Sequence, residues 1–182
     1  LIDPVDGTTN FLYGLPGYAV SIAASLTGDH RAAVGAVYVP ATDELFAAIE
    51  GRGATVNGHP IRCSTTLELS QALVATGFAY HPDRRAAQAV RLAALLPRIR
   101  DVRRLGAAAP DLCYVAAGRL DAYFEEHLGP WDLAAGELIA REAGCRTGSL
   151  DGGPARPSSV IVASPSVFDP LRDAIDEIDQ AH

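Results

Sequence analysis

The sequence predicts a layered α/β fold. Short apolar runs typical of buried strands alternate with segments in which apolar residues recur at helical spacing, and this alternation favours sheets covered by helices. The length of 182 residues suits one domain, and 48% hydrophobic with 20% charged residues is ordinary for a protein with a packed core. We therefore expect a single domain that covers residues 1–182.

The chain starts with a stretch, residues 1–11, in which two apolar residues precede two carboxylates and a glycine. The two apolar residues are expected to end a buried strand. Pro4 fixes its own φ and favours extended backbone at Asp3, so a rigid bend after the strand can aim Asp3 and Asp6 into one space. Because hard cations such as Mg²⁺ prefer carboxylate oxygen, this stretch is a candidate metal site.

Gly7 and Thr8 add a second feature to the same stretch. Glycine lets a ligand approach the backbone closely, and free N–H groups at the start of a helix suit a phosphate anion. An ordinary capped turn is the alternative, because Asp-Pro and Asp-Gly pairs are common in turns. The residue types alone leave both open, but the spacing excludes a calcium loop of the EF-hand kind.

Three apolar runs after this stretch predict an antiparallel meander. They cover residues 18–27, 31–39 and 44–50, with a turn at residues 28–29. A glycine-rich hairpin is expected at residues 51–58. Because no helix follows its G-x-G pattern, we exclude a dinucleotide-binding loop.

The remainder of the chain alternates strands with helices. Strands are expected at residues 72–78, 100–105, 120–125 and 159–163, and helices at residues 83–96, 110–117, 132–143 and 165–178. Pro97 stops the first of these helices, and its three arginines, Arg84, Arg85 and Arg91, are expected to form a solvated face. Residues 147–158 are rich in Gly, Pro and Ser and predict a loop.

The composition argues against several functions. The formal net charge of −7 disfavours a nucleic-acid-binding surface, and no apolar run reaches the roughly 18 residues of a membrane span. Cys63, Cys113 and Cys145 have no C-x-x-C spacing, which favours reduced thiols in the core of a cytoplasmic protein over a zinc site. There is neither a G-x-S-x-G elbow nor a P-loop.

Two motifs resemble the signatures of a known family. Residues 3–11, Asp-Pro-Val-Asp-Gly-Thr-Thr-Asn-Phe, resemble the first signature of the inositol monophosphatase family, and residues 131–136, Trp-Asp-Leu-Ala-Ala-Gly, resemble its second. Residues 51–54 and 57–58 resemble further family landmarks, so the resemblance covers nearly the whole chain. It implies the αβαβα sandwich of sugar phosphatases.

The start of the chain leads to a further expectation. The sequence contains no Met and begins inside a motif, so we expect a longer parent protein whose N-terminal part is missing from this chain. By resemblance, that part carries the first helical layer, a metal-binding glutamate and a carboxylate that helps to activate water.

The resemblance also implies a site for two or three Mg²⁺ ions. Asp3 is expected to bridge two ions, Val5 to offer its backbone carbonyl to the first, and Asp6 and Asp132 to bind the second. By itself, Asp132 would be interpreted as a charge that stabilises the start of a helix. The first motif makes a third metal-binding carboxylate the better explanation.

Substrate contacts follow from the same resemblance. Thr8 is expected to orient the attacking water, together with Asp3 and Asp6 as catalytic residues, and Glu125 to contact inositol hydroxyls with support from Arg103. From composition alone, Glu125 is an exposed acid at the end of a strand. The expected substrate-binding residues are Asp6, Gly7, Thr8, Gly106, Ala107, Ala108, Glu125 and Asp132.

The implied activity is hydrolysis of inositol 1-phosphate by metal-activated water, with inhibition by lithium. The family resemblance implies a homodimer, and the expected partner is a small phosphorylated polyol, without nucleic acid or membrane. Related esters, such as histidinol phosphate, sugar bisphosphates or adenosine bisphosphates, are the nearest alternatives. A second alternative is a noncatalytic module, because the upstream glutamate is absent from this chain.

Overall fold

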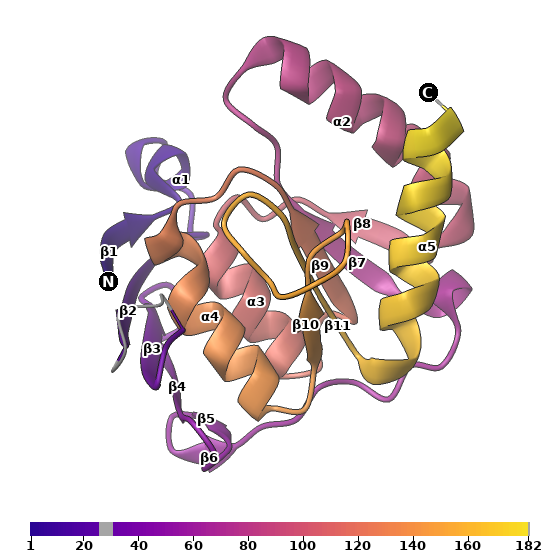
Figure 1. Ribbon diagram of the computed structural model, residues 1–182. Helices are drawn as coiled ribbons and strands as arrows, with labels where there is room; N and C mark the ends of the chain where they lie inside the picture. Colours follow the sequence, from indigo (N-terminus) through magenta and orange to yellow (C-terminus); the bar gives the residue numbers. More distant parts are fainter. Residues whose placement is uncertain (26–30, 182) are drawn as a thin grey trace.

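The computed structural model describes residues 1–25 and 31–181, which form four layers (Figure 1). A six-stranded sheet is followed by two helices, a five-stranded sheet and two more helices. The layered α/β fold that the alternation of elements predicts is therefore confirmed. The turn expected at residues 28–29, and the last two residues of the strand before it, lie outside the described residues.

The first sheet is antiparallel throughout, with the strand order β1-β2-β3-β4-β5-β6. Its strands are β1 (Ile2–Asp6), β2 (Ala19–Ala24), β3 (Val34–Val39), β4 (Glu44–Ile49), β5 (Ala54–Val56) and β6 (His59–Pro60). Asn57 and Gly58 join the last two with φ angles of 47° and 78°. Positive φ at both positions is what a two-residue hairpin turn requires, so the predicted meander and hairpin are confirmed.

The two faces of this sheet differ. One face packs on α4, and β3 and α4 approach so closely that a Cβ at Gly35 would lie 3.0 Å from Cα of Ala135. The other face exposes apolar side chains on neighbouring strands, each 46–63% accessible. We call it the open apolar face: Ile2, Ile22, Val34, Leu45 and Ile49.

The middle layer consists of α3 (Ala108–Ala116) and α4 (Pro130–Glu142). Small residues let these helices pack tightly, because a Cβ at Gly136 would lie 2.7 Å from Cδ1 of Leu112. Their buried alanines and leucines join both sheets into one core. This layer contributes to the site because α3 and α4 both start at the end of the molecule where β1 ends.

The second sheet has the order β10-β11-β9-β7-β8. Its strands are β7 (Leu73–Thr76), β8 (Asp101–Arg103), β9 (Ala122–Glu125), β10 (Arg146–Gly148) and β11 (Val160–Ala163). The prediction of a loop from residue 147 onwards is wrong at its start, because β10 pairs with β11 there. Three residues are too few for apolar alternation to reveal a strand, and the pairing depends on a partner distant in sequence.

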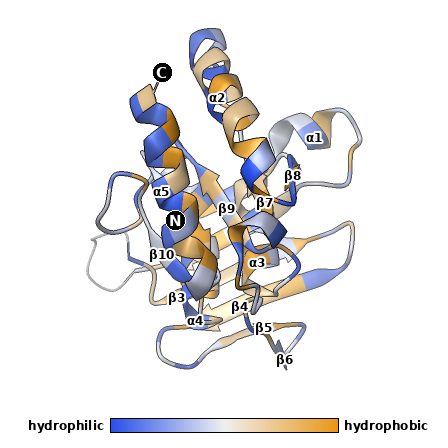
Figure 2. Ribbon diagram, turned by 90° about the vertical axis from the view of Figure 1, so that its right-hand side faces the viewer, coloured by the Kyte–Doolittle hydropathy of each residue, from blue (hydrophilic) through white to orange (hydrophobic). Residues whose placement is uncertain are grey.

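The outer layer consists of α2 (Pro82–Leu95) and α5 (Pro165–Ala181), and hydrophilic and hydrophobic residues alternate along both helices (Figure 2). The remaining helices are α1 (Thr8–Leu12) and two single 3₁₀ turns, Leu69–Gln71 and Leu96–Arg98. No helix among the described residues has both the length and the apolar character needed to cross a membrane.

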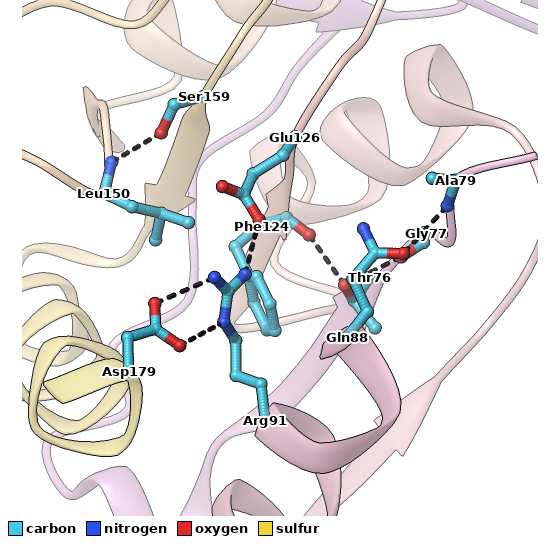
Figure 3. Close-up of polar contacts among 10 residues, drawn as sticks. All are labelled: Thr76, Gly77, Ala79, Gln88, Arg91, Phe124, Glu126, Leu150, Ser159 and Asp179. Carbon is cyan, nitrogen blue, oxygen red and sulfur yellow. Dashed lines mark hydrogen bonds and ion pairs between the residues drawn. The ribbon is translucent and has the colours of Figure 1, made fainter. Parts of the chain in front are cut away.

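Arg91 of α2 does not belong to a solvated face, and that prediction is wrong for this residue. Its guanidinium lies 2.6 Å from Oε2 of Glu126 and 2.8 Å from Oδ1 of Asp179, and its side chain is only 15% exposed (Figure 3). Arg84 and Arg85 are exposed, as predicted. The helical periodicity did not distinguish Arg91 from the other two arginines, because its partners are Glu126, which follows β9, and Asp179 of α5.

The cysteines are free thiols, as predicted. Cys113 and Cys145 are buried in the core, and Cys63 packs against it from a half-buried position. Although Cys63 and Cys145 are far apart in sequence, their side chains hydrogen-bond to each other. This hydrogen bond lowers the pKa of Cys63 to about 7, although partial burial of the thiol opposes the shift.

Candidate active site

The two carboxylates of the first motif lie within β1. The expectation that Leu1 and Ile2 end a buried strand is wrong, since their side chains are 41% and 63% exposed and the strand continues to Asp6. Apolar character indicated burial, but β1 is an edge strand of the sheet. Asp3 and Asp6 are therefore strand residues and not residues of a following bend.

A β-bulge brings Asp3 and Asp6 together. Residues three apart on a regular strand point to opposite faces. Asp3 pairs with Ser21 and Asp6 with Ala19, so an interval of three residues on β1 matches only two on β2. The extra residue turns both carboxylates toward one side, and Pro4, which lacks an N–H group, lies within the irregularity.

Asp132 completes a cluster of three carboxylates. It is in the first turn of α4, where its Oδ2 accepts a hydrogen bond of 2.7 Å from the backbone N–H of Gly129. One carboxylate oxygen from each of Asp3, Asp6 and Asp132 lies within 4.8 Å of the other two. This spacing is comparable to the span of one coordination sphere with bonds of about 2.0–2.6 Å, so the cluster fits a divalent cation.

The electrostatics of the cluster also fit a cation. Burial raises the pKa of Asp6 to about 6, and the negative charge of Asp3 adds to this, while hydrogen bonds from Ala109 and Ala108 oppose it. Burial raises the pKa of Asp132 to about 7, together with a hydrogen bond to Asp3 and the charge of Asp6. Three carboxylates that repel one another favour a proton or a metal ion between them.

The backbone after Asp6 turns sharply. Gly7 has a φ of +84°, and a Cβ there would lie 2.6 Å from the carbonyl oxygen of Gly17 and 2.9 Å from Cβ of Ala107. Only glycine fits this position without displacing the backbone. Oγ1 of Thr8, the first residue of α1, donates a 3.0 Å hydrogen bond to the carbonyl oxygen of Val5.

Asn10 connects this turn to the turn before α3. Its Nδ2 lies 2.6 Å from the carbonyl oxygen of Gly17 and 2.7 Å from that of Leu105. A Cβ at Gly106, whose φ is +102°, would lie 2.6 Å from the same Nδ2. Sequence reasoning treated Asn10 only as part of a motif and did not find this bridge, because its partners are up to 95 residues away.

The start of α3 forms a second wall. The structure begins this helix at Ala108, two residues earlier than predicted, which places the N–H group of Ala109 in the first turn. That group donates a 2.6 Å hydrogen bond to Oδ2 of Asp6. Gly106, Ala107 and Ala108 lie beside the carboxylate cluster and line the same pocket.

Glu125, at the end of β9, is half-buried and not an exposed strand-end acid. Burial raises its pKa, while a hydrogen bond from the hydroxyl of Tyr123 and the charge of Arg104 oppose the increase. The suggestion that Arg103 supports Glu125 is wrong, because Arg103 pairs with Asp101 at 2.7 Å. Adjacent residues of an extended segment point in opposite directions, so the neighbouring Arg104 faces Glu125.

A pocket of about 560 Å³ unites these groups. All the residues predicted from the sequence line it: Asp3, Val5, Asp6, Gly7, Thr8, Gly106, Ala107, Ala108, Glu125 and Asp132. The lining also includes Arg84, Arg104, His81 and His127, which add positive charge and hydrogen-bond donors to the pocket. The individual roles of the predicted residues remain predictions.

Sequence reasoning missed Asp111, which also lines the pocket. Its side chain is 2% exposed, and burial, together with the charges of Glu125 and Asp6, raises its pKa well above the ordinary value. From the sequence, an acid in the first turn of a helix is an ordinary helix-stabilising residue. The one available signal was a carboxylate inside an otherwise apolar segment.

Several known proteins are similar to this chain. The model of the inositol monophosphatase family matches residues 1–178. The inositol-1-monophosphatase of Mycobacterium leprae is 48% identical over 185 residues, and the Nus factor SuhB of Escherichia coli (strain K12) is 47% identical over 154 residues. The solved structure of Mycobacterium tuberculosis SuhB is 45% identical, with a TM-score of 0.90.

These matches cover most of the chain but only part of the relatives. The M. leprae match covers 96% of this chain and 62% of the relative, and the E. coli match covers 84% and 57%. The M. tuberculosis structure covers 100% of this chain, which covers 73% of that structure. The chain thus spans about three fifths of the length of the curated relatives that it matches. By its motifs, its fold and these similarities, the chain belongs to the inositol monophosphatase family.

Proposed function

We propose that this chain carries the metal and phosphate site of a Mg²⁺-dependent phosphomonoester hydrolase that acts on inositol 1-phosphate. The observation that carries the proposal is the meeting of Asp3, Asp6 and Asp132 beside Thr8 in one pocket. The name of the M. leprae relative, inositol-1-monophosphatase, supports the choice of substrate.

The three carboxylates would hold Mg²⁺, with the backbone carbonyl of Val5 as a further oxygen donor. When bound, Mg²⁺ supplies a water of lowered pKa and neutralises charge on the phosphate. Because the pKa values of Asp6 and Asp132 are raised to about 6 and about 7, binding releases protons from this cluster near neutral pH.

Thr8 is placed to orient the attacking water. Its hydroxyl hydrogen is committed to the carbonyl oxygen of Val5, at 3.0 Å, so its oxygen lone pairs face away from that bond. A hydroxyl that already donates acts as an acceptor, and a water that donates to it is held in one orientation.

The walls of the pocket would bind the remainder of the substrate. The turn at Gly7 and the first turn of α3 present backbone groups to a phosphate. Glu125 accepts hydrogen bonds from polyol hydroxyls, and Arg104 offsets part of its charge. Arg84, which also lines the pocket, adds positive charge that favours entry of an anionic ester.

Phosphate release tests the proposal directly. Inositol 1-phosphate, histidinol phosphate and adenosine 3′,5′-bisphosphate are each assayed with Mg²⁺, with and without Li⁺. We expect lithium-sensitive release from the inositol ester, and loss of it in Asp132→Asn. Asp101→Asn is the matched control, because Asp101 is an exposed acid outside the pocket. Release that does not depend on Mg²⁺, or an unaffected Asp132→Asn, would contradict the mechanism.

If the protein prefers another ester, the proposed mechanism stands and the proposed substrate changes.

The homodimer and the cytoplasmic location belong to the same proposal. Light scattering coupled to size-exclusion chromatography measures the oligomeric state, and a monomer would contradict that part alone.

The second candidate is a noncatalytic module. It is favoured by the E. coli relative, whose name, Nus factor SuhB, is not that of a phosphatase. Titration calorimetry with Mg²⁺ separates the candidates, because two resolved binding events count against this one.

A further inference from the structure

Asp111 has an unusual environment for a carboxylate. It belongs to the first turn of α3, is 2% exposed and borders the pocket. Its Oδ1 atom is buried and has no hydrogen-bond partner among the described residues. A buried polar atom without a partner destabilises the fold, so native proteins normally supply a partner, often a ligand or a water.

The neighbouring carboxylates differ from Asp111 in this respect. Asp6 accepts the N–H group of Ala109 at 2.6 Å, and Glu125 accepts the hydroxyl of Tyr123. Asp111 interacts electrostatically with both Asp6 and Glu125. It therefore lines the pocket close to both the proposed metal site and the proposed polyol contact.

A purely structural role explains Asp111 poorly. An acid in the first turn can stabilise a helix by accepting its free N–H groups, but the N–H of Ala109 in this turn is bonded to Asp6 and not to Asp111. A leucine at this position would pack equally well, because it has a similar shape and no polar group to desolvate. The position is thus occupied by a group that has an unused hydrogen-bond acceptor and lines the pocket.

We propose that Asp111 is a substrate-contacting residue that hydrogen-bonds a hydroxyl group of a polyol phosphate. The contact makes the pocket select esters with hydroxyl groups near the phosphate over esters with apolar leaving groups. The identity of the substrate class rests on the proposed function, but the contact itself can be tested by binding.

Binding of two phosphomonoesters provides the test. Inositol 1-phosphate and phenyl phosphate are titrated by calorimetry into the chain in the presence of Ca²⁺. For Asp111→Leu, we expect about ten-fold weaker binding of inositol 1-phosphate, the effect of one hydrogen bond, and unchanged binding of phenyl phosphate. Asp111→Asn, which keeps an oxygen acceptor and adds donors, should restore binding to within about three-fold of the wild type.

A matched control separates contact from folding. Val115 is fully buried in the same helix and does not border the pocket, so Val115→Ala should lower the thermal midpoint without changing the preference between the two esters. Asp111→Leu should unfold at the same temperature as the wild type or higher, because it removes an unsatisfied buried group.

Several outcomes would overturn the inference. Equal weakening of both esters by Asp111→Leu would mean that the partner of Asp111 is a buried water and not the polyol. No weakening of either ester, or no binding of inositol 1-phosphate to the wild type, would also overturn it. Binding with the expected preference but without phosphate release would contradict only the proposed function.

Discussion

The substitution Gly77→Ala gives a sharp test of the site geometry. Gly77 directly follows β7 and is buried behind Glu125. A Cβ at this position would lie 1.9 Å from Oε2 of Glu125 and 2.0 Å from its Cδ. Non-bonded carbon and oxygen atoms repel one another when they are closer than roughly 3.4 Å, so the carboxylate of Glu125 must move away by about 1.5 Å.

This movement of the Glu125 carboxylate breaks its hydrogen bond with Tyr123. The Tyr123 side chain is fully buried, and its hydroxyl then has no acceptor, which costs about 1–3 kcal/mol. Crowding of the added methyl group adds about 1 kcal/mol. Gly77→Ala should therefore lower the free energy of unfolding by about 2–4 kcal/mol, and it should weaken binding of inositol 1-phosphate because Glu125 has moved.

Urea denaturation of a double-mutant cycle isolates the cause. In a Glu125→Ala background the space is vacant, and Gly77→Ala should cost less than about 1 kcal/mol, which gives a coupling of about 2 kcal/mol or more between the two positions. If Gly77→Ala costs the same in both backgrounds, the clash with Glu125 is not the reason for glycine at this position, and the reasoning is refuted.

Three further predictions concern other groups. In the metal-free chain, burial raises the pKa of Asp6 to about 6, so the folded state keeps a proton that the unfolded state releases from about pH 4 upwards. The unfolding free energy of the wild type should therefore fall by about 2 kcal/mol relative to Asp6→Asn between pH 4 and pH 6, and a constant difference would contradict this. The lowered pKa and partial exposure of Cys63 predict faster alkylation by iodoacetamide at pH 7.5 than at the buried Cys113, as measured by peptide mass spectrometry; equal rates would count against it. Arg91→Met should lower the free energy of unfolding, measured by urea denaturation, by about 2 kcal/mol, because it leaves partly buried carboxylates unpaired. Arg98→Met, at an exposed ion pair, should lower it by less than about 1 kcal/mol. Similar losses for the two variants would refute the distinction.

The sequence was sufficient for the fold class and for most of the pocket lining. Apolar runs and helical spacing are local properties, so the meander, the hairpin at Asn57 and Gly58, and the helices were predicted to within a few residues. The two motifs named carboxylates and small residues that the structure gathers in one pocket. A motif carries this information because its residues are adjacent in the chain and share one turn.

The tertiary structure decided what depends on distant partners. The bulge that turns Asp3 and Asp6 to one side is defined by pairing with β2, and the burial of Arg91 by contacts with the residue after β9 and with α5. Arg104 rather than Arg103 interacts with Glu125, and Asp111 lines the pocket, because elements distant in the sequence meet there. Pairing, burial and electrostatic environment are properties of residues brought together by folding, and a linear pattern does not contain them.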